Sequence, residues 1–327
     1  MKSLTLKAAV LAALSLSALQ ASATGFVTLP TSGATAYVSC RTAPNFGSLS
    51  DTSFPTAGVD NACAILSTAS APYNAVSTIA SVPETGYSLV AGSAFTTAIP
   101  AFAETVATLN ERVWRNAGTS ECIYGKQVLM SSAAVHDYNP AKAGNNGMEV
   151  NDFAFGGFSG AVKAAYSKGT QSNYSSAYRI GRTFTSVQMQ AMPGTAGASV
   201  ATGFLVLPTT GGTLGTEING VGQTTGTTGT PVGPNPGTVA PTTAQQQAPF
   251  SANWVDFTVD TSGVADEDGF PNLNSPIMYI KQSCASGAAA TLVNGMKLRQ
   301  TGQETQPWVI VTTSTAIVHA PGTNVAP

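Results

Sequence analysis

The run Trp254-Val255-Asp256-Phe257-Thr258-Val259-Asp260 alternates between apolar and polar positions. Because successive side chains of an extended chain point to opposite faces, Val255, Phe257 and Val259 share one face, and Trp254 shares the other with the polar residues. Further short runs rich in β-branched and aromatic residues lie at 36–40, 86–90, 121–130, 148–155, 178–190, 277–280 and 308–313. The sequence therefore predicts a mainly β protein with antiparallel, β-sandwich-like sheets.

One stretch departs from the period of two. From Pro100 to Arg115, the apolar residues Phe102, Val106, Leu109 and Val113 fall at helical spacing. A proline suits the first turn of a helix, and the glycine at 118 ends the run. We therefore expect one amphipathic helix here, packed on a sheet.

The segment 216–249 is rich in Gly, Thr, Pro and Gln, and no Lys or Arg occurs between Arg182 and Lys281. With so few apolar residues, such a segment cannot offset its ordering entropy by burial, which predicts a long flexible loop or linker. We expect a β-rich domain with one helix over 24–201 and a β-rich second part over 202–327, which contains this loop. The two parts can equally form one continuous domain.

Each of these parts opens with the same motif. Residues 24–33, TGFVTLPTSG, recur at 202–211 as TGFLVLPTTG, with seven of the ten positions identical. Each copy is typical of a short strand closed by a Leu-Pro-Thr turn. A strand at the start of the mature chain can pair with the sheet edge of a neighbouring molecule, and chance recurrence in a chain rich in Thr and Gly is the alternative.

The first 23 residues are typical of a secretory signal peptide. Lys2 and Lys7 precede or flank a short apolar run, and Ala21-Ser22-Ala23 is a small-residue cleavage site. The apolar run is shorter than the roughly 20 residues that a membrane-spanning helix needs. We therefore expect cleavage after Ala23 and a protein that is secreted or held at the cell surface.

The chain is poor in charge, since only 9% of its residues are Asp, Glu, Lys or Arg. Loss of the signal peptide removes two of the 14 basic residues and none of the 16 acids, which leaves 12 − 16, or −4. A mildly acidic chain without a basic patch argues against nucleic acid as a partner. A surface of hydroxyls, amides and glycines repels copies of itself only weakly, which favours lateral self-assembly.

All four cysteines lie in the mature chain. An even number in an exported protein predicts two disulfides, for which three connectivities exist. Loop length favours Cys40 with Cys63 and Cys122 with Cys284. The second of these bonds would join the two halves of the chain.

A cluster of acids is the candidate metal site. Its members fall within 13 residues and are Asp256, Asp260, Asp266, Glu267 and Asp268. Carboxylates this close repel one another, and a Ca²⁺ ion would remove the repulsion through several oxygen ligands. The spacing does not match an EF-hand loop, and a solvated acidic loop is the alternative.

The best string for nucleophilic catalysis is Phe155-Gly156-Gly157-Phe158-Ser159-Gly160-Ala161, which approaches the Gly-x-Ser-x-Gly elbow of serine hydrolases. Ser159 would be the nucleophile, with Asp260 or Asp266 and then His319 in the order Ser, acid, His. The α/β-hydrolase fold needs alternating strands and helices, whereas this chain predicts mainly strands. A Gly-rich strand end is therefore the favoured interpretation, and no catalytic residue is assigned.

The signal peptide, the Thr- and Gly-rich mature body, the 222–249 tract and the acids from Asp256 to Asp268 together resemble a Gram-negative surface-layer structural protein of the layer or vesicle-sheath type. The four cysteines depart from that pattern. The resemblance implies self-assembly into a two-dimensional array, calcium dependence, no enzymatic activity, and outer-membrane or lipopolysaccharide components as anchoring partners. The alternatives are a fimbrial or adhesin subunit that exchanges its N-terminal strand, and a secreted serine hydrolase.

Overall fold

The computed structural model describes residues 25–31, 37–40, 63–65, 78–138, 143–167, 177, 179–183, 211–212, 248–249, 251–264, 272–301 and 308–317. The regular structure of these residues consists of strands. In the first half they are β1 Val27–Thr28, β2 Tyr37–Ser39, β3 Ser88–Leu89, β4 Phe95–Ala101, β5 Glu104–Asn116, β6 Glu121–Met130, β7 Glu149–Gly156, β8 Lys163–Ser167 and β9 Arg179–Gly181. In the second half they are β10 Gly211–Gly212, β11 Ala248–Pro249, β12 Trp254–Ser262, β13 Ile277–Ser283, β14 Ala290–Thr301 and β15 Trp308–Ile317.

These strands form two large sheets. The first sheet runs β1-β8-β13-β6-β5-β3, and β4 pairs with the N-terminal half of β5. The second sheet runs β15-β14-β7-β12-β9-β2. Every pairing within these two sheets is antiparallel, whereas the short strands β10 and β11 pair in parallel. The prediction of a mainly β protein with antiparallel sheets is confirmed.

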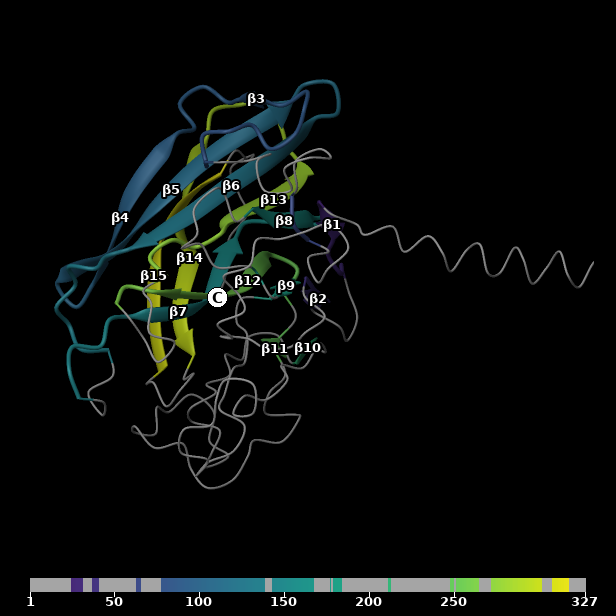
Figure 1. The fold of residues 1–327 in the computed structure, drawn as a ribbon. Helices are drawn as coiled ribbons and strands as arrows, with labels where there is room; N and C mark the ends of the chain where they lie inside the picture. The colour runs from purple at the N-terminus through teal and green to yellow at the C-terminus, as the bar shows by residue number, and fades with distance from the viewer. Residues whose placement is uncertain are drawn as a thin grey trace, which may run out of the picture.

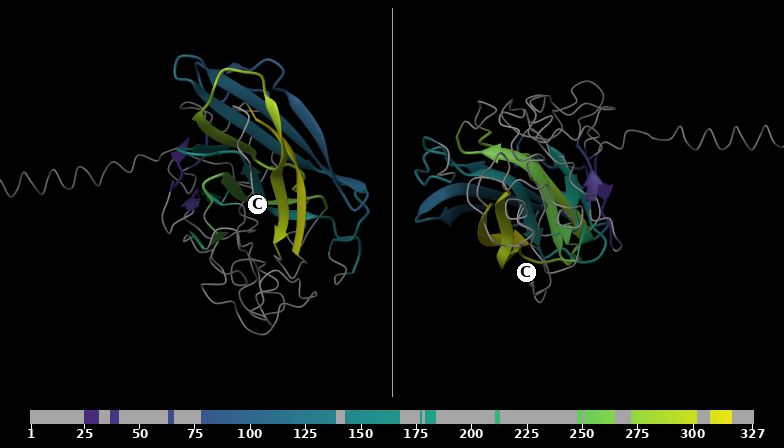
Figure 2. Two further views of the ribbon diagram at one scale, coloured as in Figure 1. Left: turned by 180° about the vertical axis from the view of Figure 1, so that it is seen from behind. Right: turned by 90° about the horizontal axis from the view of Figure 1, so that it is seen from below.

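One hydrophobic core joins the two sheets. Side chains of β5 and β6, such as Leu109 and Tyr124, meet Phe155 of β7 and Phe257 of β12 in one buried cluster. The Tyr124 ring lies edge-on to Phe158, with 5.1 Å between the ring centroids. Figure 2 shows β14 and β15, in yellow, beside the blue strands of the first sheet, and β15 contacts both β4 and β5. The facing sides of both sheets are therefore buried against each other.

The outer face of the first sheet carries a second apolar cluster. Trp114 of β5 and Tyr279 of β13 are both buried there, with their ring centroids 6.2 Å apart. Gly125 of β6 lies between the two rings. A Cβ atom at this position would come within 2.6 Å of the Trp114 ring, so no larger residue fits without a shift of that ring. The glycine therefore lets two large rings pack across β6.

The helix predicted from Pro100 to Arg115 is wrong. The stretch forms the end of β4, a two-residue turn and most of β5. Val113 and Trp114 are neighbours in sequence, and both are buried because β5 is covered on both faces. A strand with two apolar faces shows no clean period of two, so its apolar residues can fall at helical spacing by coincidence. The β-branched residues of the stretch favour the strand.

Both sheets combine strands from distant parts of the chain. In the first sheet β13 lies between β6 and β8, and in the second β12 lies between β7 and β9 (Figure 1). No helix long and apolar enough to cross a membrane occurs in the ranges that the structure describes. Most of the predicted loop at 216–249, and the second copy of the repeat up to residue 210, lie outside those ranges.

Candidate functional site

The two disulfides favoured by loop length are present. Cys40 is bonded to Cys63, with 5.0 Å between their Cα atoms, and Cys122 is bonded to Cys284, with 5.7 Å. The first bond closes a short loop next to β2. The second joins the start of β6 to the residue after β13, which are neighbouring strands of the first sheet. It therefore links segments that are 162 residues apart in sequence.

The predicted calcium ligands are only partly described. Asp256 lies in β12 and is fully buried, with its Oδ1 atom 3.7 Å from Nη1 of Arg299. Asp260 belongs to the same strand, but its side chain is outside the described part, as are Asp266, Glu267 and Asp268. Where side chains are described, no group of three or more His, Cys, Asp or Glu gathers as a metal site. Calcium binding by these acids stays a prediction.

Ser159 lies in the connection between two strands. It is exposed, and Gly157 and Gly160 on either side of it have φ angles of +88° and +77°. The chain continues into β8, whereas a nucleophile elbow continues into a helix. The two glycines are therefore explained by the turn from β7 to β8. His319, the other residue of the hydrolase hypothesis, is outside the described residues.

A buried ion pair lies in the core between the sheets. Glu111 of β5 and Lys126 of β6 are direct cross-strand partners, and the ammonium group of Lys126 donates a hydrogen bond to Oε1 of Glu111. The same ammonium group is 5.1 Å from the centroid of the Phe155 ring. Burial lowers the pKa of Lys126, and the Glu111 carboxylate opposes that shift. The pair contributes no charge to the surface.

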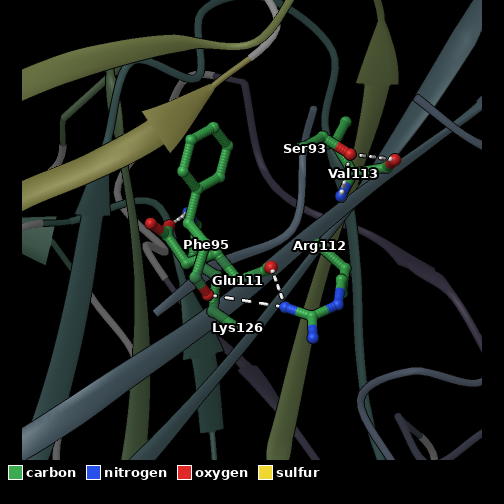
Figure 3. A network of polar contacts seen from close by, with 6 residues as sticks. All are labelled: Ser93, Phe95, Glu111, Arg112, Val113 and Lys126. Atoms are coloured by element: carbon green, nitrogen blue, oxygen red, sulfur yellow. Dashed lines mark hydrogen bonds and ion pairs between the residues drawn. The ribbon is translucent and has the colours of Figure 1, made fainter. Parts of the chain in front are cut away.

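The polar contacts around this pair hold β4 and β5 together (Figure 3). Nη1 of Arg112 donates hydrogen bonds to the backbone carbonyl oxygens of Glu111 at 2.7 Å and Phe95 at 3.4 Å. The hydroxyl of Ser93 donates to the carbonyl of Val113 at 2.9 Å. Arg112 thus joins a backbone oxygen at the start of β4 to one in its own strand, β5.

A second group of buried charges lies on the outer face of the second sheet. Asp152 of β7, Asp256 of β12 and Arg299 of β14 are completely buried, and Nη1 of Arg299 is 3.9 Å from Asp152 and 3.7 Å from Asp256. Burial, and then the negative charge of Asp152, raise the pKa of Asp256, while Arg299 opposes the rise. Two carboxyl groups therefore share one guanidinium group, and protonation of Asp256 relieves their repulsion.

Burial of charge extends through the molecule. Nine charged side chains among the described residues are buried, although such side chains are rarely fully buried in proteins. They are Glu111, Lys126, Glu149, Asp152, Arg179, Arg182, Asp256, Lys297 and Arg299. The part of the surface that the described residues form is therefore poorer in charge than their composition indicates. The alternation around Asp256 predicted its face correctly, but nothing local in the sequence identifies its partners.

The turn between β4 and β5 presents an exposed aromatic side chain. The Phe102 side chain is 59% exposed, and its ring stacks on His136 with 3.9 Å between centroids and 7° between planes. The Glu104 carboxylate accepts hydrogen bonds from the backbone N–H groups of Val135 and His136, at 2.7 Å and 3.3 Å. Burial and the nearby Glu104 carboxylate raise the pKa of Tyr138 to about 12. These contacts fix an apolar tip at one end of the first sheet.

Several charged groups of the described residues are paired inside the protein, and the four cysteines are bonded in two disulfides. The exposed side chains include the large apolar residues Phe102 and Val135 next to the turn between β4 and β5. Comparison with known proteins found no matching family model, no matching curated protein and no matching solved structure.

Proposed function

We propose that this protein is an exported structural subunit that assembles with copies of itself into a cell-surface layer or sheath. The observation that carries the proposal is the burial of nine charged side chains in a chain of which only 9% is charged. Exposed charge keeps protein molecules apart, so a surface left with few ions associates with little electrostatic cost.

The two disulfides support the same proposal. Cross-links of this kind stabilise a chain mainly by restricting its unfolded state, and they persist in oxidising compartments outside the cytoplasm. They fit a subunit that must keep its shape on the outside of a cell. Asp256 is buried beside Arg299, so calcium that joins or rigidifies subunits would bind the other acids of the cluster, Asp260, Asp266, Glu267 and Asp268.

Electron microscopy of negatively stained protein tests this function directly. Mature protein beginning at Thr24 is concentrated with Ca²⁺, with EDTA, and with EDTA followed by excess Ca²⁺. The expected result is ordered sheets or tubes, which EDTA disperses if calcium joins the subunits. Solitary particles at every concentration and in every ionic condition would overturn the proposal.

A fimbrial or adhesin subunit is the alternative, in which the strand at 24–33 enters a neighbouring molecule. In the single chain, β1 already pairs with β8, and the backbone N–H of Leu29 donates to the carbonyl of Val162 at 2.9 Å. Leu29 is buried in the core of its own molecule. Strand exchange would have to replace these contacts with identical ones from another copy.

Deletion of residues 24–33 separates the two functions. Linear fibres that disappear on deletion would favour strand exchange. Sheets that survive the deletion would favour lateral assembly through other surfaces. Circular dichroism of the deleted protein provides the control, because it shows whether the two large sheets still form.

A further inference from the structure

The sheets end in unequal edges. On one side of the molecule the edge strands are β1, with two residues, and β2, with three. On the other side they are β4, with seven residues, β3, with two, which pairs with the C-terminal end of β5, and β15, with ten. Figure 1 shows β4 and β15 on one side and β1 and β2 on the other, and β4 contacts β15. The long edges are therefore gathered together.

The long edges lack the usual protection against pairing. Edge strands in soluble proteins are commonly blunted by charged residues, especially Lys, or by Pro and bulges. Neither Phe95–Ala101 nor Trp308–Ile317 contains a charged residue. Pro100 and a bulge between Ile99 and Pro100 interrupt only the end of β4. Among the described residues, no strand pairs with the outer side of 95–99.

The turn that follows β4 is held in a strained conformation. Phe102 and Ala103 have φ angles of +48° and +64°, as in a type I′ turn, where Asn-Gly is the favoured pair. Residues with a Cβ atom adopt this region at a cost of about 1–2 kcal/mol each. The strained turn lies next to the edge and exposes the Phe102 ring. This ring stacks on His136, and the preceding residue, Val135, is 78% exposed. Local strain at an exposed apolar side chain is a feature of functional surfaces.

We propose that two copies of this chain join through antiparallel pairing of residues 95–99 of β4. This inference rests on the proposed self-assembly and names its lateral contact. Pro100 has no N–H group, so the paired stretch ends at Ile99 and has its centre at Thr97. Thr97 then faces Thr97 of the other copy, and Thr96 faces Ala98.

A second copy suits this edge because the edge is complementary to itself. The pairing brings no like charges together, and Thr96 and Ala98 are small and exposed on the outer face. The first sheet then continues across the two molecules, and β15 lies beside the junction. This one contact satisfies the outward-pointing backbone groups of residues 95–99 in both copies.

A cysteine cross-link tests the pairing and its register. The described cysteines are all in disulfides, so Thr97→Cys introduces a new thiol at the centre of the contact. Under mild oxidation, it should give at least about tenfold more covalent dimer than Ser159→Cys, because only paired positions bring two Cα atoms within bonding distance. Ser159 is the matched control because it is exposed in the connection between β7 and β8, outside the proposed contact.

A charge on the edge tests the contact without a thiol. Ala98→Lys should weaken self-association about tenfold, because the two lysines would be neighbours on one face of the joined sheet. Ala161→Lys makes the same change at an exposed turn position and should leave association unchanged. Sedimentation velocity over a range of concentrations measures both, and circular dichroism confirms that both variants fold.

The outcomes separate this inference from the proposed function. If the wild-type protein is monomeric throughout, self-assembly itself is wrong and the edge contact falls with it. If the wild type assembles while Thr97→Cys cross-links no better than Ser159→Cys, the edge contact is wrong and self-assembly stands. Efficient cross-linking together with weak association of Ala98→Lys supports the contact.

Discussion

The protein buries charge in two different ways, and the contrast shows what each costs. In the core between the sheets, one Lys and one Glu neutralise each other across adjacent strands, β6 and β5. On the outer face of the second sheet, Arg299 lies between Asp152 and Asp256. The first group is balanced as a pair of full charges. The second places two carboxyl groups beside one guanidinium group.

The difference concerns protons more than contacts. A lone buried pair keeps both charges because either charge without the other is strongly disfavoured. Burial, and then the charge of Asp152, raise the pKa of Asp256, so this carboxyl group can bind a proton and relieve its repulsion with Asp152. Arg179 and Lys297 are on the same face of the sheet and are also buried. The core pair should therefore respond to mutation, and the outer group to pH.

The largest effect is expected from breaking the core pair. Lys126→Met leaves the Glu111 carboxylate buried without its cation, which should lower the free energy of unfolding by about 3–5 kcal/mol. Urea denaturation followed by circular dichroism measures the loss. The double variant Glu111→Leu with Lys126→Met removes both charges and should recover most of it, to within about 1 kcal/mol of the wild type. Equal losses in the single and double variants would contradict an energetically coupled pair.

A smaller effect is expected from removing the cation of the outer group. Arg299→Met leaves two buried carboxyl groups together and should cost about 3 kcal/mol at neutral pH. Because both carboxyl groups can become protonated in acid, the loss should shrink as the pH is lowered toward about 4. The stability loss of Lys126→Met, measured over the same pH range, is the reference for the pH dependence of the Arg299→Met loss. A loss that is the same at pH 7 and pH 4.5 would show that Arg299 contributes through packing alone.

The smallest effect is expected from neutralising Asp256. An unfolded Asp titrates at a pH of about 4, while the folded state holds its proton to higher pH. Between these values the folded state carries more protons than the unfolded state, so the stability contributed by this residue falls as the pH rises. Asp256→Asn should remove that fall, and its cost of about 1 kcal/mol at acidic pH should shrink or change sign at pH 7.

The measurement for Asp256 is a series of urea unfolding curves for the wild type and Asp256→Asn across pH 4–8. Between the unfolded and folded pKa values of Asp256, the difference between the two free energies of unfolding should change by up to about 1.4 kcal/mol per pH unit. Parallel curves would mean that Asp256 is ionised in both states. Thr258→Val, at a buried neutral position on the same face of β12, serves as the control with no pH dependence of its own.

The strands that the sequence predicted well are those with one dominant apolar face and with turn residues at their ends. The run from Glu121 to Met130 was predicted with the bounds that β6 has, because turn residues flank it on the N-terminal side. β14 was missed. Asn294-Gly295 in its middle is a hairpin signal, yet the structure accommodates it as an irregularity between Leu292 and Met296, with a φ of +55° at Asn294. Local turn chemistry was overridden there by pairing with β7 and β15.

The buried charges could not be predicted, and the reason is geometric. Asp256 was assigned to the polar face of its strand, which is correct, but it was grouped with the acids that follow it in sequence. Its nearest charged partners come from β7, which pairs with β12, and from β14, which pairs with the other side of β7. A single sequence gives the period of each strand but not the order of strands in a sheet. Cysteines were easier, because four of them allow only three pairings.

The order of strands also governs when the chain can fold. The core of the first sheet needs β13 between β6 and β8, so it cannot close until the polypeptide has been made almost to its end. Pairings between such distant segments form slowly, because the intervening chain must first lose its freedom. A chain built in this way can complete its first sheet only late in synthesis, whatever the local preferences of its earlier strands.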